Sequence, residues 1–320
     1  MKVEDSPRVL HIVHSLGMGG AETWLLELIR HARKFDKDFP IIDIFVTSGK
    51  KDLFDDEAKS LGSNIYYVKL DKDNIINFII KFRKILINNN YTAIHDHQEF
   101  LSGWHFLFGI GLLPKVRIAH VHNPSYQLVF NYGVTKFRKL KQRLGKFFIK
   151  YLSTDVAGTS LQVLKEYGII KKRYPKQWIG ALHCSFLLEQ WDLNNITAKQ
   201  ELCEELGLSL NTKVILFAGR LDYSIEINHP QNHKNSVFAL KVFQNLSTEN
   251  VVLLYAGAND YIKDKFVSLI QENGLENQVF LLGIRKDIRK LMAASDLLFF
   301  PSRAEGLGMV AVEAQASGLC

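Results

Sequence analysis

Cysteine is scarce in this sequence, and no stretch of it is apolar enough to cross a bilayer. Its 320 residues include only three cysteines, Cys184, Cys203 and Cys320, which lie far apart and form no Cys-x-x-Cys pair. This spacing argues against a zinc site or a disulfide framework and favours a reducing cytoplasm. No uninterrupted apolar run approaches the ~20 residues that a membrane-spanning helix needs. A secretory signal is not expected either, because Glu4 and Asp5 precede the first short apolar run.

The composition is that of a globular protein with sizeable hydrophobic cores. Hydrophobic residues make up 47% of the chain and charged residues 23%, without low-complexity segments or internal repeats. A chain of 320 residues exceeds the usual size of one domain, so we expect two. The formal net charge of +7 favours anionic partners, which include phosphates, acidic lipid surfaces and nucleic acids.

Short apolar runs alternate with helical patterns along the chain. Arg8–His14 and Ile41–Thr47 are almost continuously apolar, as expected for strands of a parallel sheet covered on both faces, and the helical pattern Ala21–Phe35 lies between them. This alternation predicts a doubly wound α/β domain over residues 1–183. A similar series predicts a second α/β domain over residues 212–320, joined by a polar connector over 184–211. Further expected strands are Asn64–Lys69, Thr92–His95, Val116–His122, Asp155–Thr159, Lys213–Ala218, Val251–Ala256, Gln278–Leu282 and Asp296–Phe300. Ligands of such folds bind in the cleft outside the carboxyl ends of the strands.

A glycine-rich turn, Gly17-Met-Gly19-Gly20-Ala-Glu22, follows the first expected strand and opens a helix. Glycines in this position let backbone N–H groups approach an anion at the helix start. A dinucleotide-binding fingerprint would need glycine where Glu22 stands, and the second strand lacks the acid that would hold an NAD ribose. The turn therefore indicates a phosphate cradle or a simple tight connection between strand and helix.

Two pairs of histidines end neighbouring expected strands. His95 and His97 flank an aspartate, and His120 and His122 flank a valine. Side chains at the carboxyl ends of strands face the ligand edge of the sheet, so we expect hydrogen bonds to a polar ligand. A metal site is less favoured because the spacing matches no regular ligand set. A structural role remains open for His95 and His120, which strand alternation could turn inward.

Two cations flank a strand end and the following helix start. Arg220 follows the strand Lys213–Ala218, and Lys234 precedes the expected helix Ser236–Leu246. A guanidinium fork and a mobile ammonium together suit a pyrophosphate. The alternative is a solvated basic loop.

The segment from Glu305 to Glu313, EGLGMVAVE, follows the last expected strand and opens a helix over Met309–Ala316. N–H groups at such a helix start can bind a phosphate. The two carboxylates lie eight positions apart, about 12 Å if the interval were helical. A nucleoside diphosphate sugar could place its hexose at one carboxylate and its ribose at the other. The apolar residues Val310–Val312 predict a buried helix, in which Glu313 would need a partner.

These features together resemble the retaining, nucleotide-sugar-dependent glycosyltransferases of the GT-B architecture that are grouped with the family-4 enzymes. The likeness extends over essentially the whole chain, and the two-glutamate segment after Pro301-Ser-Arg-Ala is its most specific part. It implies two Rossmann-like domains facing a cleft and the transfer of a hexose with retention, without a metal ion or other cofactor. A UDP-sugar is the favoured donor, and a GDP-sugar is the alternative.

The resemblance also implies roles for matching residues. Gly19 and Gly20 would approach the donor phosphates and the acceptor, and His122 would contact the transferred sugar. Arg220 and Lys234 would stabilise the departing diphosphate. Glu305 would bind sugar hydroxyls and Glu313 the ribose diol. The implied catalytic residues are His122, Arg220, Lys234 and Glu305, and the implied donor-binding residues are Gly19, Gly20, Ile284, Arg285, Gly306, Leu307, Gly308 and Glu313.

Two features depart from the family pattern. Retaining members usually carry an Asn-Gly-Ile/Val-Asp type stretch at the end of the first domain, where this chain has Trp178-Ile-Gly-Ala. Members also continue for several tens of residues beyond the position of Cys320, with another strand and final helices. The resemblance therefore implies a truncated second domain, and the alternative function is that of a catalytically impaired, nucleotide-sugar-binding fragment. The sequence does not distinguish such a transferase from a phosphorylase or an epimerase of the same architecture.

The segment Lys136–Lys150 contains no acid and places apolar residues at helical spacing. It predicts either a basic amphipathic helix on a membrane surface or an ordinary surface helix. The first interpretation places the protein in the cytoplasm at the inner face of the plasma membrane. It also favours a glycan or lipid-linked acceptor and a role in cell-surface polysaccharide or glycolipid biosynthesis. We expect no nucleic-acid partner, because the chain carries no recognised binding motif.

Overall fold

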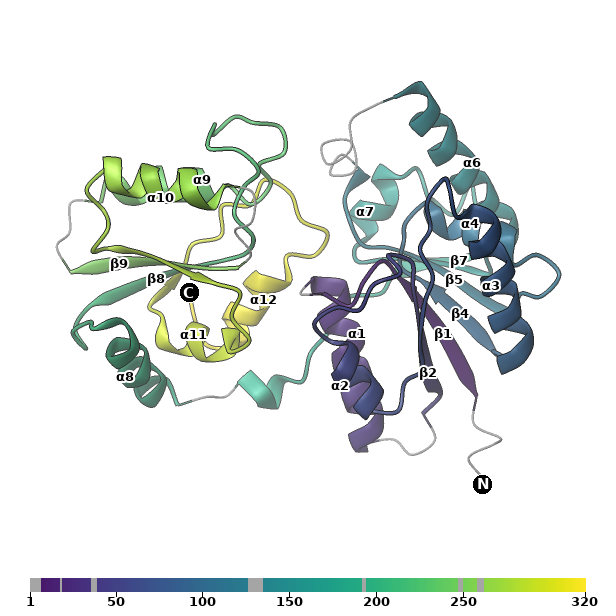
Figure 1. The fold of residues 1–320 in the computed structure, drawn as a ribbon, viewed down its shortest axis with the longest axis horizontal. Coiled ribbons are helices and arrows are strands. Elements are labelled where there is room, and N and C mark those ends of the chain that lie inside the picture. Colours follow the sequence, from purple (N-terminus) through teal and green to yellow (C-terminus); the bar gives the residue numbers. More distant parts are fainter. Residues whose placement is uncertain are drawn as a thin grey trace. The chain divides into compact units, whose positions relative to one another are not determined.

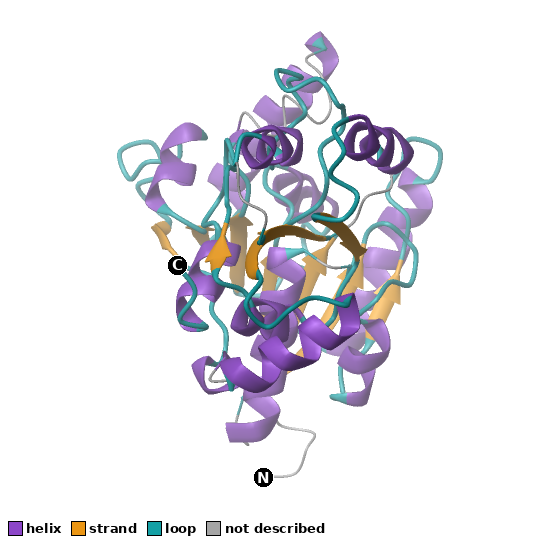
Figure 2. Ribbon diagram, turned by 90° about the vertical axis from the view of Figure 1, so that its left-hand side faces the viewer, coloured by secondary structure: helices purple, strands orange, loops and turns teal. Residues whose placement is uncertain are grey.

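The computed structural model describes residues 7–17, 19–35, 39–125, 135–191, 194–246, 250–257 and 262–320. The chain divides into two compact units, residues 1–186 and 187–320. Each unit contains a parallel sheet with helices packed against it (Figure 1). Figure 2 shows these helices in purple on either side of the orange strands. The α/β architecture expected from the sequence is confirmed.

The first unit contains a seven-stranded sheet in the order β3-β2-β1-β4-β5-β6-β7. Its strands are β1 (Arg8–Val13), β2 (Ile41–Val46), β3 (Ile65–Tyr67), β4 (Ala93–Asp96), β5 (Val116–Val121), β6 (Asp155–Gly158) and β7 (Trp178–Ala181). Its helices are α1 (Gly20–Phe35), α2 (Asp55–Ser60), α3 (Ile75–Asn89), α4 (Leu101–Phe108), α6 (Lys136–Leu152) and α7 (Leu161–Glu166). The strand order reverses direction between β1 and β4, which is the position where ligands bind in doubly wound sheets.

The apolar strands of this sheet are buried on both faces. Leu10 and Phe45 belong to one hydrophobic cluster, whereas Val13 and Ile44 belong to another that includes Leu25 of α1. Alternate residues of β1 and β2 therefore enter different clusters, which explains why these strands are almost continuously apolar.

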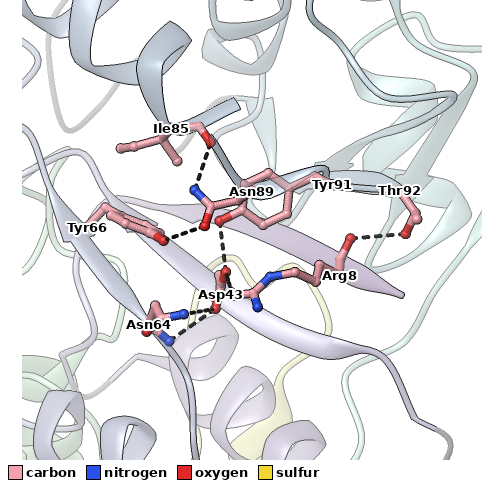
Figure 3. Close-up of polar contacts among 8 residues, drawn as sticks. All are labelled: Arg8, Asp43, Asn64, Tyr66, Ile85, Asn89, Tyr91 and Thr92. Atoms are coloured by element: carbon pink, nitrogen blue, oxygen red, sulfur yellow. Dashed lines mark hydrogen bonds and ion pairs between the residues drawn. The ribbon is translucent and has the colours of Figure 1, made fainter. Parts of the chain in front are cut away.

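The amino-terminal ends of β1 and β2 are tied together by one buried carboxylate (Figure 3). Asp43 of β2 is fully buried and pairs with the Arg8 guanidinium at 2.5 Å. The Tyr91 hydroxyl donates to the same carboxylate at 2.8 Å, and Asn64 donates to it through its backbone and side-chain nitrogens at 3.1 and 3.0 Å. Burial raises the pKa of Tyr91, so its hydroxyl keeps the proton that it donates. This network fixes the edge of the sheet opposite the carboxyl ends of the strands.

The second unit contains a four-stranded sheet in the order β10-β9-β8-β11. Its strands are β8 (Lys213–Ala218), β9 (Val251–Ala256), β10 (Val279–Gly283) and β11 (Leu297–Leu298). Its helices are the 3-10 helix η2 (Leu188–Trp191), α8 (Asn195–Leu206), α9 (Ser236–Gln244), α10 (Lys263–Glu272), α11 (Ile288–Ala294) and α12 (Met309–Ala316). Every strand pair in both sheets is parallel.

The polar region 184–211, expected to be a connector, contains the twelve-residue helix α8. The Asn194 side chain accepts hydrogen bonds from the N–H groups of Ile196 and Thr197, and Gly207 ends the helix with φ of 67°. Asparagine at the N-cap and glycine at the C-cap are ordinary helix signals. Among the described residues, no helix has the length and apolar character required to span a membrane.

Candidate functional site

The loop from β8 to α9 is held by a buried aspartate that sequence reasoning did not single out. Asp222 is 4% exposed and accepts hydrogen bonds from the backbone N–H groups of Asn235 at 2.9 Å and Val237 at 3.1 Å. Its own N–H donates to the Ser236 hydroxyl at 2.9 Å. Burial raises the pKa of Asp222, and these donors favour the charged form. Asp222 therefore fixes the start of α9, and its place directly after Gly219-Arg220-Leu221 was the available sequence signal.

Lys234 and Glu305 meet at the carboxyl edge of the second sheet. The Lys234 ammonium lies 2.6 Å from a Glu305 carboxylate oxygen, although the two residues are 71 positions apart. Their side chains are 27% and 26% exposed, so the pair is accessible to a ligand. The ammonium also lies 5.7 Å from the centre of the Phe300 ring. Asn235 joins the same two segments, because its amide donates to the Pro301 carbonyl at 3.0 Å.

Arg220 adds a second positive charge next to Lys234. A Cβ atom on Gly219 would lie 3.6 Å from the Lys234 side chain, which places the backbone before Arg220 beside that lysine. Burial, followed by the charges of Arg220 and Lys234, lowers the pKa of His233. The Arg220 side chain is exposed and has no hydrogen bond or ion pair with any residue that the structure describes. Two cations thus share one corner of this unit, and Arg220 is available to an anion.

The start of α12 follows Glu305 directly. Gly308 is its N-cap residue and has a positive φ of 71°, a conformation that glycine adopts without strain. The N–H groups of Gly306, Leu307 and Gly308 make no hydrogen bond within the described part of the chain. Free N–H groups beside two cations form a site suited to a diphosphate.

The expectation of a buried α12 is wrong. Ala314 is its buried residue, whereas Val312 is 40% exposed. Met309, Val310, Ala311 and Ala316 are only partly buried. Glu313 is half-buried on this helix. As expected for a partly buried carboxylate, it interacts with another group of the protein.

In the first unit, Gly20 begins α1 and Gly19 lies in a tight turn, where its N–H donates to the Gly17 carbonyl at 3.1 Å. A Cβ atom on Gly19 would lie 2.2 Å from a Glu22 carboxylate oxygen, so a larger residue here would displace the Glu22 side chain from its present position. Burial raises the pKa of Glu22 to about 7. The turn thus holds a carboxyl group against the helix start.

His122 lies among other histidines. It is 8% exposed, and its Nε2 atom lies 2.8 Å from Nδ1 of His97. His97 in turn contacts His11 of β1, with 3.0 Å between Nε2 and Nδ1. His95 and His120 are also buried, with 3.1 Å between Nε2 and Nδ1. Burial lowers the pKa of all five histidines, so these imidazoles are neutral at pH 7.

Residues 198–320 match the family described as glycosyl transferases group 1. This match covers the second unit from α8 onward, including Arg220, Lys234, Glu305 and Glu313. The chain belongs to the GT-B glycosyltransferases.

Other known proteins are similar to this glycosyltransferase over nearly its whole length. The putative glycosyltransferase EpsF of Bacillus subtilis (strain 168) is 28% identical over 319 residues, which are 98% of this chain and 77% of EpsF. The capsular polysaccharide biosynthesis glycosyltransferase CapH of Staphylococcus aureus is 26% identical over 312 residues, 96% of this chain and 78% of CapH. The crystal structure of Anabaena Alr3699/HepE in complex with UDP-glucose has a TM-score of 0.77 at 18% identity and covers 98% of this chain and 79% of that one. The GT-B fold is thereby confirmed.

Ile284 and Arg285 of this glycosyltransferase lie after β10. Ile284 is 56% exposed. The Arg285 guanidinium pairs with Glu205 of α8 and, at 2.7 Å, with Asp287. These carboxylates raise the pKa of Arg285 and hold its side chain against α8. Among the described residues its ion-pair partners are Glu205 and Asp287, and neither belongs to the Lys234–Glu305 pair, so a role beside the nucleotide base stays a prediction.

Proposed function

We propose that this glycosyltransferase transfers a hexose, with retention of configuration, from a nucleoside diphosphate sugar to a glycan or lipid-linked acceptor. UDP is the favoured nucleotide. The observation that carries the proposal is the convergence of Arg220, Lys234 and Glu305 on the free N–H groups at the start of α12. The UDP-glucose complex of a protein with the same fold supports the choice of nucleotide.

The two cations would act on the leaving group. Cleavage of the bond between the anomeric carbon and the phosphate oxygen leaves negative charge on the diphosphate and positive charge on the sugar. Arg220 and Lys234 stabilise the diphosphate, and this interaction strengthens as the bond breaks. The acceptor hydroxyl attacks from the face that the diphosphate leaves, and the departing phosphate oxygen takes its proton. The new bond then has the configuration of the old one.

The ion pair between Lys234 and Glu305 allows Lys234 to bind the diphosphate while Glu305 binds the sugar. An ammonium has three N–H donors, so Lys234 can bind a phosphate oxygen while one donor remains on Glu305. The second Glu305 oxygen then accepts a hydrogen bond from a donor-sugar hydroxyl. Glu305 thereby links the position of the sugar to that of the cation that stabilises the leaving group.

Glu313 is proposed to accept hydrogen bonds from the ribose diol. Glu313→Ala should weaken UDP binding at least about tenfold, because hydrogen bonds to a charged group are among the stronger ones. Isothermal titration calorimetry with UDP measures the change. Gln315→Ala, at an exposed position of the same helix, is the matched control and should leave the affinity unchanged. Equal affinities of wild type and Glu313→Ala would remove the ribose role.

Helix α6 is proposed to dock on an anionic membrane. Its inner side packs closely on α4, since a Cβ atom on Gly145 would lie 2.2 Å from the Phe100 carbonyl oxygen. The apolar residues that remain exposed are Phe137 (69%), Leu140 (52%), Leu144 (36%), Phe147 (54%) and Tyr151 (62%). Exposed cations, including Lys139 and Arg143, lie on the same helix, which contains no acid. An apolar stripe with flanking cations suits the headgroup region of a bilayer.

This docking would bring the enzyme to a lipid-linked acceptor at the inner face of the plasma membrane. The likeness to CapH supports a place in the biosynthesis of a cell-surface polysaccharide.

Replacing Lys139 and Arg143 together by glutamate should lower the affinity for vesicles of phosphatidylglycerol and phosphatidylcholine roughly tenfold or more, because each cation near an anionic surface contributes about 1 kcal/mol. Co-sedimentation measures binding. The control variant replaces the exposed Lys263 and Lys265 of α10 by glutamate, which changes the net charge equally. An equal loss in both variants would point to bulk charge and would contradict docking through α6.

A further inference from the structure

Lys234 is held on both sides to the segment that joins β11 to α12. The His233 carbonyl, one residue before it, accepts a hydrogen bond from the Arg303 N–H at 2.8 Å. The Asn235 side-chain amide, one residue after it, donates to the Pro301 carbonyl at 3.0 Å. The lysine therefore lies between two hydrogen bonds that join the same two backbone segments. Only one of these bonds depends on a side chain, that of Asn235.

The Asn235 side chain does not cap helix α9, although this residue occupies the N-cap position. An asparagine at an N-cap usually accepts hydrogen bonds from N–H groups of the first turn. Asn235 makes no such side-chain bond. The Asp222 carboxylate instead accepts from the Val237 N–H of that turn, at 3.1 Å. The usual reason for an asparagine at this position is therefore absent.

The conformation of Asn235 also argues for a role of its amide. Its φ of 59° lies in the left-handed region, which glycine adopts with the least strain. Its amide oxygen is buried and has no hydrogen-bond partner among the described residues, which costs free energy. A glycine here would avoid both costs and would keep the backbone bond to Asp222. It would lose only the amide bond to Pro301.

We propose that Asn235 is a positioning residue that fixes Lys234 for the departing diphosphate. This inference rests on the proposed transfer reaction and adds the group that preorganises its cation. A lysine has a flexible four-carbon stem, so the place of its ammonium depends on how firmly its backbone is held. With both neighbours of Lys234 bonded to residues 301–303, the ammonium is held beside Glu305 before the donor binds. A preorganised charge stabilises the transition state without a cost of reorganisation.

Asn235→Gly removes the amide and retains a backbone that adopts the left-handed conformation. We expect kcat, measured as UDP release from saturating UDP-glucose, to fall roughly tenfold, because small displacements of a catalytic group have large effects on rate. The affinity for UDP in calorimetry should fall only about threefold, since the interaction with the diphosphate strengthens as the bond breaks. Asn245→Gly, the same substitution at the exposed C-cap of α9, is the matched control and should change neither quantity.

A double-mutant cycle separates the positioning of Lys234 from a general structural role. If Asn235 acts through Lys234, Asn235→Gly should change kcat less than about twofold once Lys234 has been replaced by alanine. Urea denaturation checks that each variant is folded. Asn235→Ala, which removes the same amide, repeats the cycle if the glycine variant does not fold.

Two results would overturn the positioning role. One is a kcat of folded Asn235→Gly within twofold of wild type, and the other is an equal loss with and without the Lys234 side chain. Failure of the proposed reaction gives a different result, because Lys234→Ala alone would then release UDP as fast as wild type.

Discussion

Lys234→Ala should lower kcat roughly 10²–10³-fold at saturating UDP-sugar, because removing one preorganised group that stabilises transition-state charge has an effect of this size. The free energy of unfolding should change little. The Lys234–Glu305 pair is partly exposed, and ion pairs of that kind contribute little to stability. UDP release measures turnover, and urea denaturation measures stability.

Lys241→Ala is the matched control for this experiment. Lys241 is an exposed residue of α9, the same helix that Lys234 precedes, and it lies in its last turn. We expect its kcat to equal that of wild type. Turnover of Lys234→Ala within twofold of wild type would contradict its assignment to the leaving group.

Asp43→Ala should lower the free energy of unfolding of the first unit by about 3–5 kcal/mol, because it leaves a largely buried charge and several donors without their acceptor. Arg8, Tyr91 and Asn64 all lose their shared carboxylate, and strands β1 and β2 lose the group that joins their amino ends (Figure 3). Urea denaturation followed by circular dichroism measures the loss.

Asp56→Ala provides the comparison. Asp56 pairs with Lys51 on the surface, where its side chain is 77% exposed, so its removal should have a much smaller effect than that of Asp43. Similar losses in the two variants would contradict the structural role given to the buried network.

The strands could be predicted because their burial leaves a clear pattern. Arg8–His14 and Ile41–Thr47 are apolar at nearly every position, and the structure places them as β1 and β2, two interior strands of a sheet that is covered on both faces. The same pattern identified β8 and β9. Helix α8 was missed because its sequence is polar on most sides, although Asn194 and Gly207 are good cap residues.

The candidate site could be predicted only in part. The cations and glutamates were found from their positions at strand ends and helix starts. Their contacts depend on tertiary structure, and sequence spacing does not show that Lys234 meets Glu305. Asp222 was missed because its place directly after Gly219-Arg220-Leu221 is a weak signal, and its structural role depends on the three groups at the start of α9 that surround it.

The histidines were also predicted only in part. His95, His97, His120 and His122 were singled out at strand ends, but His11 lies inside an apolar run and gave no signal. Their convergence follows from the strand order, in which β1 lies beside β4 and β4 beside β5. Strand order is a property of the whole sheet, so the five-histidine cluster could not be read from local spacing.

The central claim is that residues 187–320 bind a nucleoside diphosphate sugar through Arg220, Lys234, Glu305 and the start of α12. Isothermal titration calorimetry of the 320-residue chain with UDP-, GDP- and ADP-glucose tests it most directly. We expect UDP-glucose to bind with the highest affinity, and we expect that affinity to fall in Lys234→Ala and with rising salt concentration. If none of the three nucleotide sugars binds, or if Lys234→Ala binds UDP-glucose as tightly as wild type at every salt concentration, the account is contradicted.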